Sequence, residues 1–195
     1  MATALPARQR LLETAERLFY DAGITTTGVD TVVREAGVSK PTLYAHFRSK
    51  GELVAAVLGA RHARRVAELE SRVAREADPA RRPLAVFDFL ATWYEEQGSR
   101  GCAFLNAAAE LGDGDDAARR AVVAEKRWLA DFLAGLVRDA GARDLERVAS
   151  QLLLLVDGVS GRVVVHGPAA AEAALADARG AAELLLAGAA PGGPA

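Results

Sequence analysis

Cysteine is almost absent from this chain, because Cys102 is the only one in 195 residues. A single cysteine excludes an intrachain disulfide framework and favours a reducing compartment such as the cytoplasm. It also leaves one candidate nucleophile, and His46, His62 and His166 are far apart in sequence with no acid at metal-ligand spacing. We therefore expect no enzyme, no metal site and no cofactor.

Long uninterrupted apolar runs are also missing. The first ten residues, MATALPARQR, lack the apolar segment of a secretion signal. The longest apolar run, residues 152–165, is interrupted by Asp157 and Arg162 and is shorter than a membrane span. No membrane partner is predicted, and a cytoplasmic location is expected.

Alternating strand patterns and internal repeats are absent, whereas apolar residues make up 51% of the chain and recur at helical spacing. The sequence therefore predicts an all-α protein of about nine helices. The expected helices cover residues 6–22, 29–36, 40–47, 50–77, 84–96, 102–111, 117–140, 145–165 and 169–187, with Asp144 as a candidate cap for the eighth.

An excess of positive charge is lacking as well. The net charge is −2 and the isoelectric point about 6.0, which alone argues against a nucleic-acid binder. Residues 1–50, however, hold seven arginines and lysines against five acids, a balance of +2, and the remaining residues carry −4. A small basic head on an acidic body fits local binding of phosphate groups.

Residues 27–50 contain two short helical patterns that meet at Gly37. Val29, Val32, Val33 and Ala36 form one apolar stripe, and Gly37 supplies a left-handed residue that ends the helix. Two short helices joined by a tight glycine turn are typical of a helix-turn-helix. An ordinary three-helix corner without DNA binding is the alternative interpretation.

The second helix of this motif offers a polar outer face. Ser39 can cap it, Pro41 falls in its first turn, and Leu43 and Phe47 form its buried edge. We expect Lys40 and Thr42 to reach base edges, and Tyr44 and His46 to point toward the sugar-phosphate walls. Ser49 and Glu52 form a capping box that places Lys50 in the first turn of the next helix, where a phosphate could dock.

The run GVSKPTLYAHFRSKGELVAAV resembles the recognition region of the TetR/AcrR family of transcriptional regulators. The matching residues are Gly37, Val38, Ser39, Thr42, Leu43, Tyr44, Phe47, Lys50 and Leu53, with Ala15, Leu18, Phe19, Gly23, Thr26 and Thr27 upstream. The resemblance covers about the first 55 residues, and Val32-Val33 departs from the common Ile-Ala. The resemblance and the polar outer face of the second helix together predict these DNA-contacting residues: Thr27, Ser39, Lys40, Pro41, Thr42, Tyr44, His46 and Lys50.

The resemblance implies a DNA-binding domain at 1–50 and a helical effector-binding and dimerisation domain at 51–188, with 50–77 as a connecting helix. The Gly/Pro-rich residues 189–195 are expected to be a disordered tail. An enclosed small-molecule pocket is also implied, and its apolar or aromatic effector remains unidentified. Residues that could line it are His62, Phe89, Trp93, Phe104, Asn106, Trp128, Phe132 and Asp157, although plain core is the favoured interpretation for each of them.

The segment 145–165 is apolar all round at residues 152–156 and then contains the small residues Gly158 and Gly161. Such a helix must be covered on every side, by its own domain or by a partner. The resemblance implies a homodimer through the last two helices. A central helix buried within a monomer is the alternative.

Together these features predict a ligand-responsive regulator that binds double-stranded DNA. The resemblance implies a repressor that occupies a palindromic operator as a homodimer and is released by its effector. Two alternatives stay open. One is a redox-sensing regulator acting through Cys102, and the other is a helical interaction module that does not bind DNA.

Overall fold

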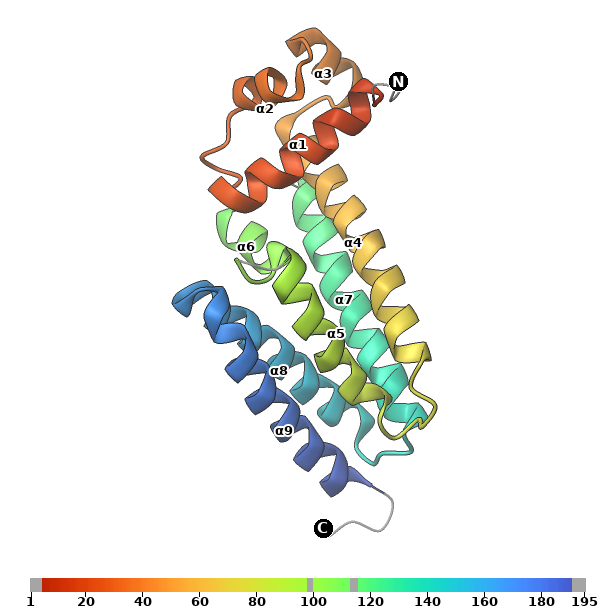
Figure 1. The fold of residues 1–195 in the computed structure, drawn as a ribbon. Helices are drawn as coiled ribbons and strands as arrows, with labels where there is room; N and C mark the ends of the chain where they lie inside the picture. Colours follow the sequence, from red (N-terminus) through yellow and green to blue (C-terminus); the bar gives the residue numbers. More distant parts are fainter. Residues whose placement is uncertain (1–4, 98–99, 113–115, 191–195) are drawn as a thin grey trace. The chain divides into compact units, whose positions relative to one another are not determined.

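A computed structural model of the chain describes residues 5–97, 100–112 and 116–190, and this part is helical with no strand (Figure 1). The predicted all-α fold of nine helices is confirmed. The helices are α1 (Ala7–Ala22), α2 (Val29–Ala36), α3 (Lys40–His46), α4 (Lys50–Ala74), α5 (Arg82–Gln97), α6 (Ala103–Glu110), α7 (Asp116–Asp139), α8 (Leu145–His166) and α9 (Ala171–Ala189), with a short 3-10 helix η1 (Pro168–Ala170) before α9.

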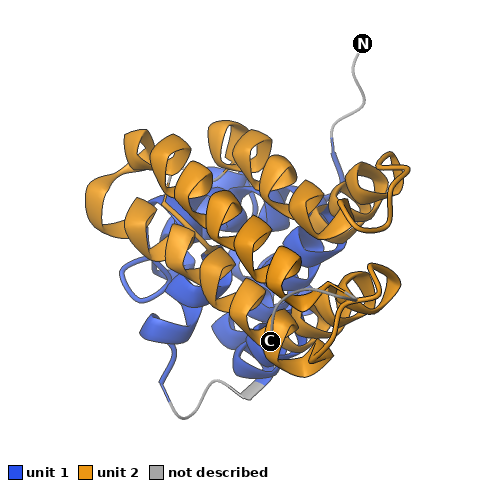
Figure 2. Ribbon diagram, turned by 90° about the horizontal axis from the view of Figure 1, so that it is seen from below, with its two compact units in different colours: residues 1–64, 103–125 blue, residues 65–102, 126–195 orange. Residues whose placement is uncertain are grey.

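The chain divides into two compact units (Figure 2). Unit 1 comprises residues 1–64 and 103–125, and unit 2 comprises residues 65–102 and 126–195. Helices α4 and α7 each contribute residues to both units. Unit 1 therefore contains more than the predicted head of residues 1–50.

Within unit 1, helices α1, α2 and α3 pack around one small core (Figure 1). Leu11 and Ala15 of α1, Val32 of α2 and Leu43 of α3 are completely buried. Val32 belongs to the pair at which the sequence departs from the family pattern, and the core accommodates its side chain. The apolar stripe that predicted the two-helix motif is thus the face that holds it together.

The turn and caps around α3 follow the predicted pattern. Gly37 ends α2 in the left-handed region at φ 62°, and the Val38 N–H donates to the Val33 carbonyl. Ser39 Oγ accepts the Thr42 N–H at 3.2 Å. Before α4, Ser49 Oγ accepts the Glu52 N–H at 3.1 Å, and Glu52 in return accepts the Arg48 N–H at 2.7 Å.

Three element ends differ from expectation. Helix α4 stops at Ala74, three residues before the predicted end, because Asp78 and Glu76 side chains accept nearby backbone N–H groups and stabilise a turn instead. Asp144 does not cap α8: its backbone is left-handed at φ 53°, and its carboxylate pairs with Arg147. Helix α9 runs through Ala189, and residues 191–195 of the predicted tail lie outside the described residues.

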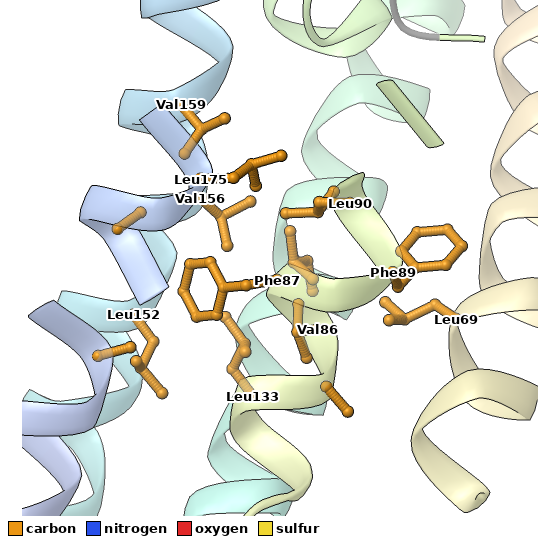
Figure 3. Close-up of a cluster of buried hydrophobic side chains, with 14 of the residues drawn as sticks. Leu69, Val86, Phe87, Phe89, Leu90, Leu133, Leu152, Val156, Val159 and Leu175 are labelled. Atoms are coloured by element: carbon orange, nitrogen blue, oxygen red, sulfur yellow. The ribbon is translucent and has the colours of Figure 1, made fainter. Parts of the chain in front are cut away.

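The core of unit 2 is built on α5, which presents aromatic side chains to two sides (Figure 3). Phe87 points toward Leu152 and Val156 of α8, whereas Phe89 points the other way, toward Leu69 of α4. Burial on both sides explains why α5 is apolar around most of its circumference. Inside this core the Tyr94 and Ser160 hydroxyls share a 2.6 Å hydrogen bond, so α5 is joined to α8 by a buried polar contact.

Helix α8 is covered on one side only. Leu152 and Val156 are buried, but Leu154 is 68% and Val165 73% exposed. At 22 residues, α8 is longer than the apolar run read from the sequence. By length and composition it could cross a membrane, although 39% of its most apolar stretch is buried inside unit 2.

Replacing Gly37 by alanine should lower the stability of the fold. A Cβ at this position meets nothing within 4 Å, so the penalty is the left-handed backbone alone, about 1 kcal/mol. Gly59 is the matched control, because it also has open space but lies inside α4, where alanine should add about 0.5–1 kcal/mol. Urea unfolding of both variants measures the free energy of unfolding relative to the parent. A change of the same sign in both variants would contradict this prediction.

Candidate nucleic-acid interface

Helix α3 is positioned from one side only. Leu43 is fully buried and Phe47 is 3% exposed, so these two side chains fix the helix on the core of unit 1. Phe47 was expected within the helix but is the residue that follows it, and its N–H donates to the Leu43 carbonyl at 2.8 Å. The remaining face of α3 is left for a ligand.

That remaining face carries most of the predicted DNA-contacting residues. Lys40, Pro41, Tyr44 and His46 are exposed, with Tyr44 at 45%, and Thr42 is half-buried at the edge. Exposed Ala45 between them leaves room for close approach to a surface. One short helix thus presents an ammonium and hydroxyl groups. These groups can donate hydrogen bonds to acceptors on base edges and phosphates.

Ser39 and Lys50 flank this face at two helix starts. The Ser39 hydroxyl contacts Thr42 Oγ1 at 2.7 Å as well as capping α3, so its role in the structure is to order the first turn. Lys50 is the first residue of α4 and is half-buried. A cation at a helix start is a combination that can bind a phosphate.

Thr27 is the one predicted DNA-contacting residue whose side chain is buried. Its side chain is 4% exposed, and its hydroxyl donates to the Leu18 carbonyl at 3.3 Å inside unit 1. The buried hydroxyl needs this partner, so Thr27 stabilises the link between α1 and α2. Its side chain is not part of the exposed face.

Arg10 is a residue that the sequence reasoning missed. From α1, its guanidinium donates to the carbonyls of Ala36 at 3.0 Å and Gly37 at 3.3 Å. These carbonyls belong to the end of α2, where a cation also interacts favourably with the helix dipole. Arg10 therefore holds the corner of the helix-turn-helix, and its spacing of 26 residues from Ala36 gives no local signal in the sequence.

Ion pairs engage several cations of the head. Arg17 pairs with Glu35 at 2.5 Å, and Lys40 pairs with Asp30 at 2.8 Å. Asp30 raises the pKa of the Lys40 ammonium, first through their hydrogen bond and then through charge attraction. Among the described residues, Arg34, Arg48 and Lys50 have no ion-pair partner, so the charge available to phosphates is small and localised.

Helices α4 and α6 are tied to the head within unit 1. Glu110, the last residue of α6, accepts the Thr25 N–H at 2.8 Å, and a Cβ added to Gly23 would lie 3.0 Å from the same carboxylate. On α4, the buried Arg61 pairs with Glu16 of α1 at 3.1 Å and stacks over the Tyr20 ring. The two hydrogen bonds join residues 85 and 45 positions apart, and the sequence pattern did not reveal these contacts.

The predicted effector residues lie in different surroundings. In unit 1, His62 meets Phe104 edge-on, with ring centroids 6.4 Å apart, and Asn106 is half-buried on the same helix as Phe104. In unit 2, the Trp128 and Phe132 rings stack at 5.1 Å. Asp157 pairs with Lys126 at 2.5 Å, so its charge is already matched.

Two clefts of unit 2 lie beside α5, and the sequence analysis did not distinguish them. The first, of about 420 Å³, lies between α4 and α5, and both Phe89 and Trp93 of the predicted set line it. The second, of about 660 Å³, lies between α5 and the η1–α9 segment. Its lining includes Phe87, Ala91, Leu175, Asp88 and Arg179. Both volumes suit a small organic molecule.

Cys102 is buried at 9% exposure, directly before α6. A buried thiol is poorly placed to meet an oxidant. In the described ranges, no group of three or more His, Cys, Asp or Glu side chains could hold a metal ion.

Comparisons with known proteins give one consistent answer. Residues 11–57 match a family model described as bacterial regulatory proteins, tetR family, and residues 79–179 match a tetracyclin repressor-like C-terminal domain. The HTH-type transcriptional regulator TtgR of Pseudomonas putida is 30% identical over 171 residues, 80% of this chain and 79% of that protein. The HTH-type transcriptional activator FasR of Mycolicibacterium smegmatis is 39% identical over 98 residues, 48% of this chain and 43% of that protein.

Solved structures agree. The crystal structure of SCO4454, a TetR-family transcriptional regulator from Streptomyces coelicolor, has a TM-score of 0.86 to this chain at 31% identity. The match covers 95% of this chain and 96% of that one. It therefore includes both units as well as the helix-turn-helix.

Changing Ser39 to alanine should loosen α3, because the Thr42 N–H loses its cap. We expect a loss of about 1 kcal/mol in unfolding free energy, with faster amide hydrogen exchange in α3. Ser71, an exposed serine inside α4, is the control, since alanine there should leave stability unchanged or slightly higher. Equal exchange rates in α3 of the parent and the Ser39 variant would show that the cap is dispensable.

Proposed function

The chain belongs to the TetR family of bacterial transcriptional regulators, and from this premise we propose that it binds a palindromic operator as a homodimer and is released by a small-molecule effector. The observation that carries the proposal is α3. Its inner edge is fixed by Leu43, and its outer face presents Lys40, Thr42 and Tyr44. A helix-turn-helix places such a face in the major groove, with its N-terminal residues at base edges.

The dimer is supported by the exposed apolar side of α8 and α9. Leu154 and Val165 lie on one face of α8 at a spacing that helical geometry aligns, and Leu184 of α9 is 77% exposed. A shallow groove of about 420 Å³ runs between the two helices, lined by Leu154, Gly158, Ala174, Ala178 and Ala181 among others. Small residues let a second copy approach closely, and its apolar side chains would cover surface that water disfavours.

A dimer also accounts for the apolar character of α8 without a membrane. Covering Leu154 and Val165 by a second copy gives the outer face of the helix the burial it lacks in a single chain. We therefore assign the protein to the cytoplasm, where its operator is.

The effector is proposed to bind in unit 2 and to act through α4. The cleft that Phe89 and Trp93 help to line adjoins α4, and these two rings suit an apolar or aromatic molecule. Glu68, Arg72, Arg75 and Glu96 line the same cleft and offer partners for polar groups of that molecule. The same helix continues into unit 1, where it bears Lys50 and Arg61. A shift of α4 on binding would change the spacing of two recognition helices in a dimer. To change operator occupancy from nearly full to nearly empty, the effector must bind the released conformation more tightly than the DNA-binding conformation by about 5.5 kcal/mol.

Repression is the direction that we propose. Effector binding that displaces the recognition helices removes the protein from its operator, which is the simplest consequence of such a shift. The FasR relative bears the name of an activator, so the sign of regulation is tested separately, by transcription from an operator-bearing promoter with and without the purified protein.

Replacing Lys50 by alanine and Tyr44 by phenylalanine should weaken binding about equally on all duplex sequences. Each loses a contact to the sugar-phosphate backbone, and loss of the Lys50 charge should flatten the dependence of log K on log salt by about one unit. Changes at Lys40 or Thr42 should instead alter which sequence is preferred. Fluorescence anisotropy over a range of salt concentrations measures both effects.

The control for this series is Arg147→Ala, which removes an exposed cation of unit 2 that pairs with Asp144. It should leave both affinity and salt dependence unchanged. If the variants at Lys40, Thr42, Tyr44 and Lys50 all bound DNA like the parent, α3 would not be the DNA-reading surface. A helical interaction module would then be the better interpretation.

Leu154→Glu should convert the dimer to a monomer, because it buries a carboxylate in an apolar contact without a partner. Sedimentation at micromolar concentration gives the mass. Val123→Glu is the matched control, since Val123 is also an exposed apolar residue but lies on α7 in unit 1. A parent protein that sediments as a monomer, or a Leu154 variant that remains dimeric, would disprove the proposed interface.

A further inference from the structure

Asp30 lies within unit 1 beside the outer face of α3, which we call the reading face. The proposed function assigns no role to Asp30. It belongs to the first turn of α2, and its Oδ1 is 2.8 Å from Nζ of Lys40, the first residue of α3. The pair therefore bridges the two helices of the helix-turn-helix. Both side chains are exposed, Asp30 at 76% and Lys40 at 51%.

The exposure of this pair means that it adds little to folding. Water and salt screen an exposed ion pair, and ordering two side chains opposes its attraction. The pair nevertheless places a carboxylate among groups that would meet DNA phosphates. A negative charge there opposes binding to any duplex, in a head whose balance is only +2.

The geometry gives the carboxylate a second effect, on the direction of the lysine. A lysine ammonium sits on a flexible four-carbon stem and reaches phosphates over a wide range. Asp30 occupies one of its three N–H donors, and that hydrogen bond raises the pKa of Lys40. The other two donors remain at the N-terminal end of α3, where a guanine O6 or N7 acceptor can meet them in the major groove.

We propose that Asp30 is a specificity-determining residue, which holds Lys40 for base reading and keeps it from general phosphate contacts. The proposal rests on the proposed function, in which α3 enters the major groove. Asp30 acts through Lys40 and by repelling phosphates, and it does not itself need to touch a base. It lowers affinity for arbitrary duplexes more than affinity for the operator.

The test compares two duplexes of equal length, one selected by the purified full-length protein from a random pool and one with scrambled sequence. Asp30→Asn should raise affinity for the scrambled duplex and steepen its salt dependence by about one unit, because Lys40 becomes free to neutralise a phosphate. The ratio of selected to scrambled affinity should fall by up to about fivefold, because an exposed ion pair holds Lys40 only weakly. Asp30→Glu, which keeps the carboxylate, should preserve most of the ratio.

Two controls separate this role from a general charge effect. Glu35→Gln removes one negative charge from the same helix, where it pairs with Arg17, and should leave the affinity ratio unchanged. In a Lys40→Ala background, Asp30→Asn should change both affinities by the same factor and so leave the ratio as it is. Asp30→Ser repeats the comparison with a second residue that has no charge and is favourable at a helix start.

The outcomes are distinct. If the parent prefers the selected duplex and Asp30→Asn and Asp30→Ser keep that preference in full, the role of Asp30 is disproved while the proposed function stands. The same holds if Asp30→Asn lowers the ratio equally in the Lys40→Ala background. If the parent does not distinguish the two duplexes, the proposed function itself fails.

Discussion

The burial of Leu43 is the interaction on which the outer face of α3, the proposed DNA-reading surface, depends. Helix α3 has only seven residues, far fewer than a helix needs to be stable in isolation. It exists because Leu43 and Phe47 pack on the core of unit 1, because Ser39 caps its start, and because Gly37 turns the chain at the required angle. Arg10 secures the same corner from α1. Every polar side chain on the outer face of α3 takes its position from this small core.

The sequence predicted those parts of the structure that are set by local chemistry. The end of α2 at Gly37, the Ser39 cap and the capping box of α4 depend on residues within four positions of one another, so their signals are contiguous. Helix α4 and Asp144 show the limit of such reasoning. An apolar spacing that continued to residue 77 did not reveal that Glu76 and Asp78 stabilise a turn, and Asp144 has the right residue type but a left-handed backbone.

Contacts between distant segments could not be predicted. Thr27 matched the family pattern, yet its hydroxyl serves the Leu18 carbonyl in the interior, because a buried hydroxyl must find a partner. Arg10 binds the carbonyl of Ala36, 26 residues away, and Glu110 binds the N–H of Thr25, 85 residues away. For the effector, aromatic residues at helical spacing suit core and pocket equally. Phe89 and Trp93 line a cleft but are also buried in the core of unit 2, and Trp128 and Phe132 stack on each other against that core, so all four stay predictions as effector residues.

The proposed recognition of DNA rests on a few placed groups and not on bulk attraction. Several cations of its head are engaged by acids or by carbonyls, and the net charge of the chain is −2. In the proposed dimer, two such heads at the correct spacing act together on one site. Selection of bound duplexes from a random pool by the purified protein tests this most directly. The account predicts an inverted repeat whose half-sites are centred about 34–36 Å apart; recovery of no motif, or of a single motif without two-fold symmetry, would contradict it.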